Sequence, residues 1–301
     1  MTNNSQPRLG LVCITVGPEI RFRTITRTRY LLLSEAEREA RLRELYTSNL
    51  NRLFNALEYC HSHAIHLYRA TSALFPLNDD VIGAAVLESM RELLAPFGKL
   101  AEQLGVRVVL HPDQFVVLSS LSDAVVRQSI GILERHAHSF DLLNLPRSTW
   151  AAMNIHGGKS GRSDELVATI ASLPISIRSR LVLENDEHAY SALDILEICR
   201  RAKVPMIFDN HHHAVKEKLS DYDDASMAEM VAAAGETWPH PEWQMVHLSN
   251  GRDSFNDPRH SDLITNVPRA FESVPWIEVE AKAKEEALED LRRSWPSNQR
   301  R

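Results

Sequence analysis

The sequence predicts a single (β/α)8 TIM barrel. Short, mostly apolar runs of strand-forming residues alternate with longer segments of helical periodicity, which is the pattern of a parallel sheet. Eight such units fit into the 301 residues, and no Pro-, Gly- or Ser-rich linker or change of composition divides them. We therefore expect one domain over residues 1–301, with flexible tails at about 1–7 and 290–301.

The individual elements follow in order along the chain. The eight predicted strands are Leu9–Cys13, Ile65–Arg69, Val106–His111, Met153–His156, Leu181–Glu184, Met206–Asp209, Gln244–Leu248 and Trp276–Glu280. Three of the helices between them have clear signals. Ser34 and Glu37 fit a capping box before an amphipathic stretch that runs to about His63. Apolar residues recur at i, i+3 and i+4 in Ser122–Leu143 and in Ala192–Ala202.

Charge and composition exclude several classes of protein. The net charge of −6 argues against a protein that coats nucleic acid by bulk positive charge, although ions bound at one site would reverse the local field of an enzyme. The three cysteines form no CxxC pair, so neither a disulfide framework nor a thiolate zinc site is indicated. The N-terminus lacks the apolar region of a signal peptide, and no apolar run would span a membrane. We expect a soluble, cytoplasmic protein with no membrane partner.

Polar residues at the strand ends predict a site for several metal ions. Active sites of such barrels lie at the C-terminal ends of the strands. Six of the eight strands finish with a His, Asp or Glu beside apolar residues, namely His111, His156, Glu184, Asp209, His247 and Glu280. Any one of them alone is more simply explained as a structural histidine, a helix cap or an ion pair. Six converging on one mouth favour metal binding.

This mixture of ligands suits two kinds of chemistry. Imidazoles together with carboxylates are accepted by zinc or manganese, whereas alkaline earth ions would draw mostly oxygen. Two or more ions about 3.5–4 Å apart activate water and clamp a phosphate, which favours phosphodiester hydrolysis. A metal-dependent sugar isomerase is the alternative enzyme, and a metal-stabilised DNA-binding module is the non-catalytic alternative, although six ligands exceed what binding needs.

Three segments are predicted to contact DNA. The segment Arg21–Tyr30, in the loop after the first strand, carries four arginines and no acid, and a merely solvated basic loop is the alternative; the four are Arg21, Arg23, Arg27 and Arg29. Lys159 follows His156 in a glycine-rich turn that offers backbone N–H groups, but the turn has no Walker pattern, so we expect no nucleotide cofactor. Gln114 and Phe115 should project from the barrel mouth unless Phe115 is buried in the next helix.

The motifs LHPDQF, NIHGGK, LENDE, FDNHHHA, VHLS and EVEAKAKE, in this order, resemble the UV damage endonuclease family, which shares its barrel and three-metal arrangement with endonuclease IV. The resemblance runs from Leu9 to about Glu286. It implies ATP-independent incision of duplex DNA on the 5′ side of cyclobutane dimers and 6-4 photoproducts, leaving a 3′-hydroxyl and a 5′-phosphate. It also implies a monomer with up to three divalent ions, usually Mn²⁺, with Zn²⁺ or Mg²⁺ as alternatives.

The resemblance further implies a role for each ligand. His111, His156 and Glu184 would hold the first ion, and Glu184 would bridge to a second ion held by Asp209, His247 and Glu280. The third ion would be held by His212 and His260. Glu184, Asp209 and Glu280 would be the catalytic carboxylates, while Gln114 and Phe115 would take the place of a Gln–Tyr wedge that fills the gap left by an extracted lesion.

The sequence also departs from the family pattern. Met245 stands where some relatives have a lysine that is modified to a carbamate near the metals. A histidine found after the second strand in relatives is replaced in the segment Asn78–Asp80, and Asp80 aligns best as a candidate metal ligand. Leu11 and Thr15 replace a tyrosine and an asparagine of the first strand, which removes the DNA contacts expected there.

Overall fold

The computed structural model describes residues 6–112 and 115–295 and confirms the barrel. Its strands pair in parallel in the order β1-β2-β3-β4-β5-β6-β7-β8, and β8 closes on β1. The strands are β1 (Arg8–Val12), β2 (Leu67–Ala70), β3 (Arg107–Leu110), β4 (Met153–His156), β5 (Leu181–Glu184), β6 (Met206–Asp209), β7 (Met245–Leu248) and β8 (Trp276–Val279). Three of them have the predicted bounds, and the others differ by one or two residues at an end.

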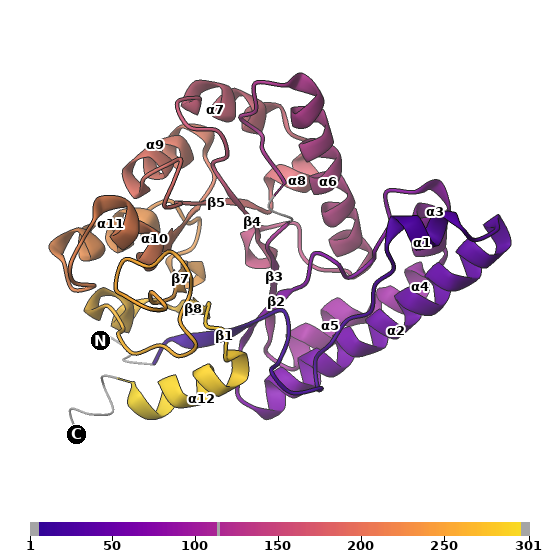
Figure 1. The fold of residues 1–301 in the computed structure, drawn as a ribbon, viewed down its shortest axis with the longest axis horizontal. Coiled ribbons are helices and arrows are strands. Elements are labelled where there is room, and N and C mark those ends of the chain that lie inside the picture. The colour runs from indigo at the N-terminus through magenta and orange to yellow at the C-terminus, as the bar shows by residue number, and fades with distance from the viewer. Residues whose placement is uncertain (1–5, 113–114, 296–301) are drawn as a thin grey trace.

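The helices surround the strands, and α2 with its neighbours α1, α3 and α4 extends to one side of the barrel (Figure 1). The helices are α1 (Arg27–Leu31), α2 (Glu35–Ser62), α3 (Val81–Ser89), α4 (Arg91–Leu94), α5 (Pro96–Gln103), α6 (Asp123–Leu142), α7 (Ser163–Ser172), α8 (Ile175–Arg178), α9 (Ala192–Ala202), α10 (Asn210–Glu217), α11 (Ala225–Gly235) and α12 (Lys284–Ser294). Short 3-10 turns occur at η1 (Thr149–Ala151), η2 (Pro241–Trp243) and η3 (Arg269–Ser273).

The predicted helix signals are confirmed where they were clearest. The Ser34 side chain accepts a hydrogen bond from the Glu37 amide, and the Glu37 carboxylate accepts one from the Ser34 amide, so α2 begins with the expected capping box. The C-terminal region differs from expectation. Residues 290–294 belong to α12, and Trp295 is buried, because this helix packs its apolar face against the barrel.

The inner surface of the barrel is divided into an apolar layer and a polar layer. Residues two apart on a strand share a face, so Val182 and Glu184 both point inward, as do Met245 and His247. The lower layer is a buried apolar cluster that contains Leu67, Val109, Ala152, Val182, Ile207, Met245 and Trp276. The upper layer carries the histidines and carboxylates. The strand pattern therefore lifts the polar groups to the C-terminal mouth.

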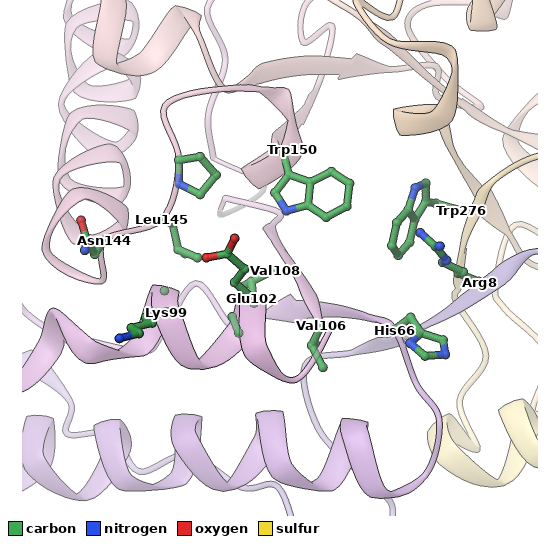
Figure 2. A pocket seen from close by; sticks show the side chains of 14 residues that line it. Arg8, His66, Lys99, Glu102, Val106, Val108, Asn144, Leu145, Trp150 and Trp276 are labelled. Carbon is green, nitrogen blue, oxygen red and sulfur yellow. The ribbon is translucent and has the colours of Figure 1, made fainter.

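Arg107 closes the opposite, N-terminal end of the barrel. Its guanidinium is fully buried and donates to the carbonyl oxygens of Thr149, Trp150 and Trp243 at 2.8–2.9 Å. It also lies 4.9 Å from the ring centre of Trp150 and 5.3 Å from that of Trp276. A cavity of about 810 Å³ lies beside this end, between α5 and the rings of Trp150 and Trp276 (Figure 2). None of the strand-end ligands lines it, so the volume of this cavity does not mark the chemistry.

Candidate metal centre

Three groups of potential metal ligands lie at the C-terminal ends of the strands. In each group the ligand atoms lie within 4.8 Å of one another. The groups are His111, His156 and Glu184; Glu184, Asp209 and His212; and His247, Glu278 and Glu280. The fold thus brings together seven of the eight residues predicted as ligands. The eighth, His260, lies beside the third group, with its Nδ1 atom 3.5 Å from Oε2 of Glu280.

Glu184 occupies the centre of the site. Its Oε2 atom lies 3.7 Å from Nε2 of His111 and 4.0 Å from Nε2 of His156. Its Oε1 atom lies 2.9 Å from Nδ1 of His247 and 3.6 Å from Nδ1 of His212. One carboxylate therefore faces four imidazoles from four different elements, which is the position that a ligand bridging two ions requires.

Local structure at the start of α10 explains why one histidine of three faces the site. Asp209 ends β6 and caps α10, since its Oδ1 atom accepts a hydrogen bond from the His212 amide at 2.7 Å. His211 uses both ring nitrogens elsewhere, with the Tyr222 hydroxyl and the Asp257 carbonyl oxygen each at 2.8 Å. His213 contacts the Ser226 hydroxyl. Of this run of three histidines, only His212 belongs to a ligand group.

Nearby carboxylates raise the pKa values of two imidazoles that burial alone would lower. Burial by itself lowers the pKa of His247, but the carboxylates of Glu184 and Glu278 outweigh it and raise the pKa to about 10. Burial is likewise outweighed at His212, where Asp209 and Glu184 raise the pKa to about 9. Burial acts to raise the pKa of Glu184, yet His247 and His156 hold it well below its usual value. Without metal, protonated imidazoles therefore supply the cations that the acids need.

The site also contains buried polar atoms without hydrogen-bond partners, and these fit a metal ion. Within the described residues they include Oδ2 of Asp209, Nδ1 of His156 and both carboxylate oxygens of Glu278. Buried polar atoms without partners are costly and rare in folded proteins. Nitrogen and oxygen donors in this mixture suit Zn²⁺ or Mn²⁺. The residues present therefore fit a site for divalent ions.

Two residues at the site, the buried Glu278 and the partly buried Arg69, were not predicted. Glu278 lies one inner-facing position before Glu280 on β8, and its side chain is 1% exposed. Arg69, from β2, forms ion pairs with both Glu278 and Glu280. Alternation along β8 could have revealed Glu278, because residues two apart share a face. Arg69 had no such signal, since a strand end without His, Asp or Glu indicated no ligand.

The grouping differs from the expected partition, and Asp80 does not join it. The third group places His247 with Glu278 and Glu280, whereas the expected second ion shared His247 and Glu280 with Asp209. Asp80 belongs to none of the three groups. Its Oδ1 atom caps α3 by accepting a hydrogen bond from the Ile82 amide, and it also accepts one from the Tyr30 hydroxyl. Helix capping accounts for Asp80.

The predicted DNA contacts divide into two sets. Arg21 donates to backbone carbonyl oxygens of its own loop, Arg23 pairs with Glu44 and Arg27 pairs with Asp79. Arg27 and Arg29 lie in α1, which lies beside α3, well to the side of the barrel (Figure 1). Most of these arginines are therefore partnered or distant from the strand ends.

The other set lies at the mouth. Exposed Lys159 lines a cavity of about 340 Å³ together with His111 and His156. The Phe115 side chain is 69% exposed, which contradicts the alternative of a buried helix residue, and Gln114 lies outside the described residues. A second mouth cavity, of about 390 Å³, is lined by basic and ligand side chains that include Arg259, His260, Glu280, Lys282 and Lys284. Cationic cavities thus flank the metal groups.

No helix in the described part of the chain combines the length and apolar character needed to cross a membrane.

Met245, at the position of the modified lysine in relatives, is buried in the apolar layer, and Leu11 and Thr15 are buried as well.

Comparison with known proteins agrees over nearly the whole chain. The family model described as UV-endonuclease UvdE matches residues 7–299. A UV DNA damage endonuclease from Nostoc sp. is 55% identical over 297 residues, which cover 98% of this chain and 92% of the relative. One from Deinococcus radiodurans is 51% identical over 289 residues, 95% of each chain.

Solved structures agree with this result. The crystal structure of SacUVDE superimposes with a TM-score of 0.80 at 26% identity, over 96% of this chain and 99% of the other. A D-psicose 3-epimerase superimposes with a TM-score of 0.51 at 14% identity, over 78% of this chain and 83% of the other, and this shows a shared fold alone. On these matches the chain belongs to the UV-endonuclease UvdE family, whose members are UV-damage repair endonucleases.

Proposed function

We propose that the enzyme is a metal-dependent hydrolase that incises duplex DNA on the 5′ side of cyclobutane dimers and 6-4 photoproducts, leaving a 3′-hydroxyl and a 5′-phosphate. Family membership supports the substrate. The observation that supports the chemistry is the placement of Glu184, whose carboxylate faces four imidazoles next to buried acidic oxygens without partners. Such a site has little use in a protein that only binds DNA.

The ligands would hold up to three divalent ions, with Mn²⁺ proposed as the activating ion and Zn²⁺ or Mg²⁺ as alternatives. His111, His156 and Glu184 would hold one ion, and Glu184 would bridge to the ion bound by Asp209, His247 and Glu280. His212 and His260 would complete a third position. When bound, such ions supply Lewis-acid stabilisation of the phosphate charge and lower the pKa of water.

The chain's own residues keep the catalytic carboxylates in place. The Asn154 amide donates to Oε2 of Glu184, which fixes the plane of this carboxylate. Asp209 is held because Oδ1 caps α10, so that Oδ2 is left to face the site. Glu280 is the more exposed carboxylate, and it borders the cavity that also contains Lys282 and Lys284. We therefore place the scissile phosphate on this side of Glu184.

Contacts to DNA would come from both sides of the mouth. Lys159 is proposed to bind a phosphate beside the first ligand group, and Arg29 remains available because no ion pair involves it among the described residues. Arg21, Arg23 and Arg27 would have to exchange their present partners for phosphates. Exposed Phe115, with Gln114, would fill the gap beside an extracted lesion. The enzyme is proposed to act in the cytoplasm as a monomer.

Incubation of the protein with Mn²⁺ and plasmid DNA tests this proposal. We expect nicking of UV-irradiated plasmid, no nicking of unirradiated plasmid and no activity after chelation. End-labelled oligonucleotides with one photoproduct would locate the cut, and extension by a polymerase would reveal the 3′-hydroxyl. Conversion of an aldose panel without any nicking would instead support a sugar isomerase and would overturn the proposal.

A further inference from the structure

Glu278 is a buried carboxylate that the proposed mechanism does not use. It is the inner-facing residue of β8 between Trp276, in the apolar layer, and Glu280, at the mouth. Its side chain is 1% exposed, and neither carboxylate oxygen has a hydrogen bond of good geometry among the described residues. Burying a carboxylate is unfavourable unless nearby groups compensate it. The neighbours of Glu278 should therefore indicate its role.

The neighbour that matters is the imidazole of His247, whose two nitrogens face different acids. Nδ1 lies 2.9 Å from Glu184 Oε1 and 3.3 Å from Glu280 Oε1, so this nitrogen faces the carboxylates that are proposed to bind metal. Nε2 points to the other side of the ring and lies 3.2 Å from Oε1 of Glu278. Because His247 is itself 1% exposed, water does not compete for either nitrogen.

We propose that Glu278 is a positioning residue that makes His247 an Nδ1 metal ligand. In the metal-loaded protein the Nε2–H of His247 would donate to Oε1 of Glu278 across this 3.2 Å contact, which would fix the tautomer and the ring orientation and leave the Nδ1 lone pair facing Glu184 and Glu280. Histidine ligands in metal sites usually donate their second ring nitrogen in this way, and the acceptor raises the basicity of the ligand. The inference rests on the proposed metal dependence.

Arg69 explains why Glu278 acts as an acceptor and not as a ligand. Its guanidinium Nη1 atom lies 2.5 Å from Oε1 of Glu278 and also pairs with Glu280. The positive charge from β2 therefore compensates Glu278 at Oε1, the same oxygen that faces His247 Nε2. Glu278 also lies one inner-facing position deeper than Glu280, whose side chain is 13% exposed. A charge balanced inside the barrel needs no ion of its own.

Two substitutions separate the hydrogen bond from the negative charge. Glu278→Gln keeps the size and one acceptor oxygen, whereas Glu278→Leu removes both the acceptor and the charge. Asp141→Asn serves as a matched control, because Asp141 is a partly buried carboxylate that pairs with the fully buried Arg180 outside the barrel. The measurements are the number and affinity of bound Mn²⁺ ions, from electron paramagnetic resonance of the free ion, and the ¹⁵N shifts of His247 in Zn²⁺-loaded protein.

We expect Glu278→Leu to weaken Mn²⁺ binding by roughly 10- to 100-fold and to produce a mixture of His247 tautomers. Glu278→Gln should restore most of the affinity and the Nδ1-bound signal, with the wild-type number of ions, while Asp141→Asn should match wild type. Unchanged affinity and shifts in both Glu278 variants would overturn the positioning role. Loss of one whole ion in Glu278→Gln would overturn it too, because Glu278 would then be a ligand. A wild-type protein that binds no Mn²⁺ or Zn²⁺ would instead overturn the proposed function on which the inference rests.

Discussion

The two ends of the barrel bury charge in opposite ways. At the N-terminal end, Arg107 is surrounded by tryptophan rings and donates to three backbone carbonyl oxygens, with no ion pair in the described part of the chain. At the C-terminal end, Asp209 and Glu278 are equally buried but retain oxygens without hydrogen bonds. The first arrangement is complete within the chain, whereas in the second Arg69 compensates Glu278 and Oδ2 of Asp209 is left to face a cation. The difference separates the end that stabilises the fold from the end that reacts.

The pKa values give the same contrast. Burial lowers the pKa of Arg107 to about 9, because the carbonyl oxygens and rings around it carry no full negative charge and the charge of Glu278 offsets the burial only in part. At the other end, carboxylates outweigh burial and raise the pKa of His247 to about 10. Burial alone therefore does not distinguish a functional site. The sign of the charges packed around the buried group does.

The largest expected effect is at the reactive end. Glu184→Gln should reduce incision by at least about 100-fold, because it removes the charge that faces both proposed ion positions. The metal-free variant should melt below the wild type, because His247 and His156 hold the pKa of Glu184 well below its usual value and its charge therefore stabilises the metal-free fold. Incision assays, metal analysis and thermal melting check these outcomes. Activity within tenfold of wild type, with metal retained, would contradict the bridging role.

A substitution at the N-terminal end of the barrel should lower the stability of the fold and leave metal binding unchanged. Arg107→Ala leaves a cavity and three buried carbonyl oxygens without donors, so we expect a loss of about 3–5 kcal/mol in the free energy of unfolding. Mn²⁺ affinity, measured well below the melting temperature, should stay near that of wild type. Arg91→Ala is the control, because Arg91 forms an exposed pair with Glu88 and should change stability by about 0.5 kcal/mol or less. If Arg107→Ala weakens metal binding as much as folding, the two ends are coupled.

A pH series should distinguish the metal-free protein from the loaded one. The pKa values of His247 and His212 are raised in the fold, to about 10 and about 9, above about 6.5 in unfolded chains. Their contribution to stability is therefore fully present below about pH 6.5 and is lost as the pH rises toward 9–10. Melting with EDTA should fall by several degrees over this window, whereas melting with Mn²⁺ should fall less. Parallel curves would show that these imidazoles are not where the metal binds.

The smallest effect on incision should come from substitutions of Gln114 and Phe115, which are proposed to contact DNA at the barrel mouth. Replacing Gln114 and Phe115 by alanine together removes an exposed ring that can stack on a base, worth on the order of 1–3 kcal/mol. Binding and incision of photoproduct DNA should weaken by about tenfold or more, while binding to undamaged duplex, metal content and melting stay near wild type. Gel-shift titrations on both DNAs provide the measurement. An equal loss on both would make the pair a general DNA contact.

The sequence was sufficient for the barrel and for most ligands because both follow from local patterns. A ligand at a strand end, such as His156 or Asp209, follows an apolar run that can be recognised without tertiary information. Arg69 and Glu278 were missed because their contact depends on how β2 and β8 are placed on the two sides of β1. That register cannot be read from either segment alone.

The partners of the arginines after the first strand could not be predicted from the sequence either. The segment from Arg21 to Tyr30 contains no acid, yet Arg23 pairs with Glu44 from α2, and Arg27 pairs with Asp79, which lies just before α3. Both partners come from segments that the fold brings alongside the loop. Asp80 was assigned by position after a strand, but the helix that starts at the next residue uses it as a cap. Local sequence shows which groups are present, and tertiary structure decides their partners.

Closure of the barrel by β8 on β1 also determines when, during synthesis of the chain, the complete set of ligands can assemble. Leu9 pairs with Ile277, so about 270 residues separate the two closing strands, and Glu280 follows directly after β8. At synthesis rates of about 5–20 residues per second, roughly 13–54 s pass between the two strands on the ribosome. Contacts this distant in sequence also make folding slow. A growing chain therefore contains His111 and Glu184 long before Glu280 can join their site.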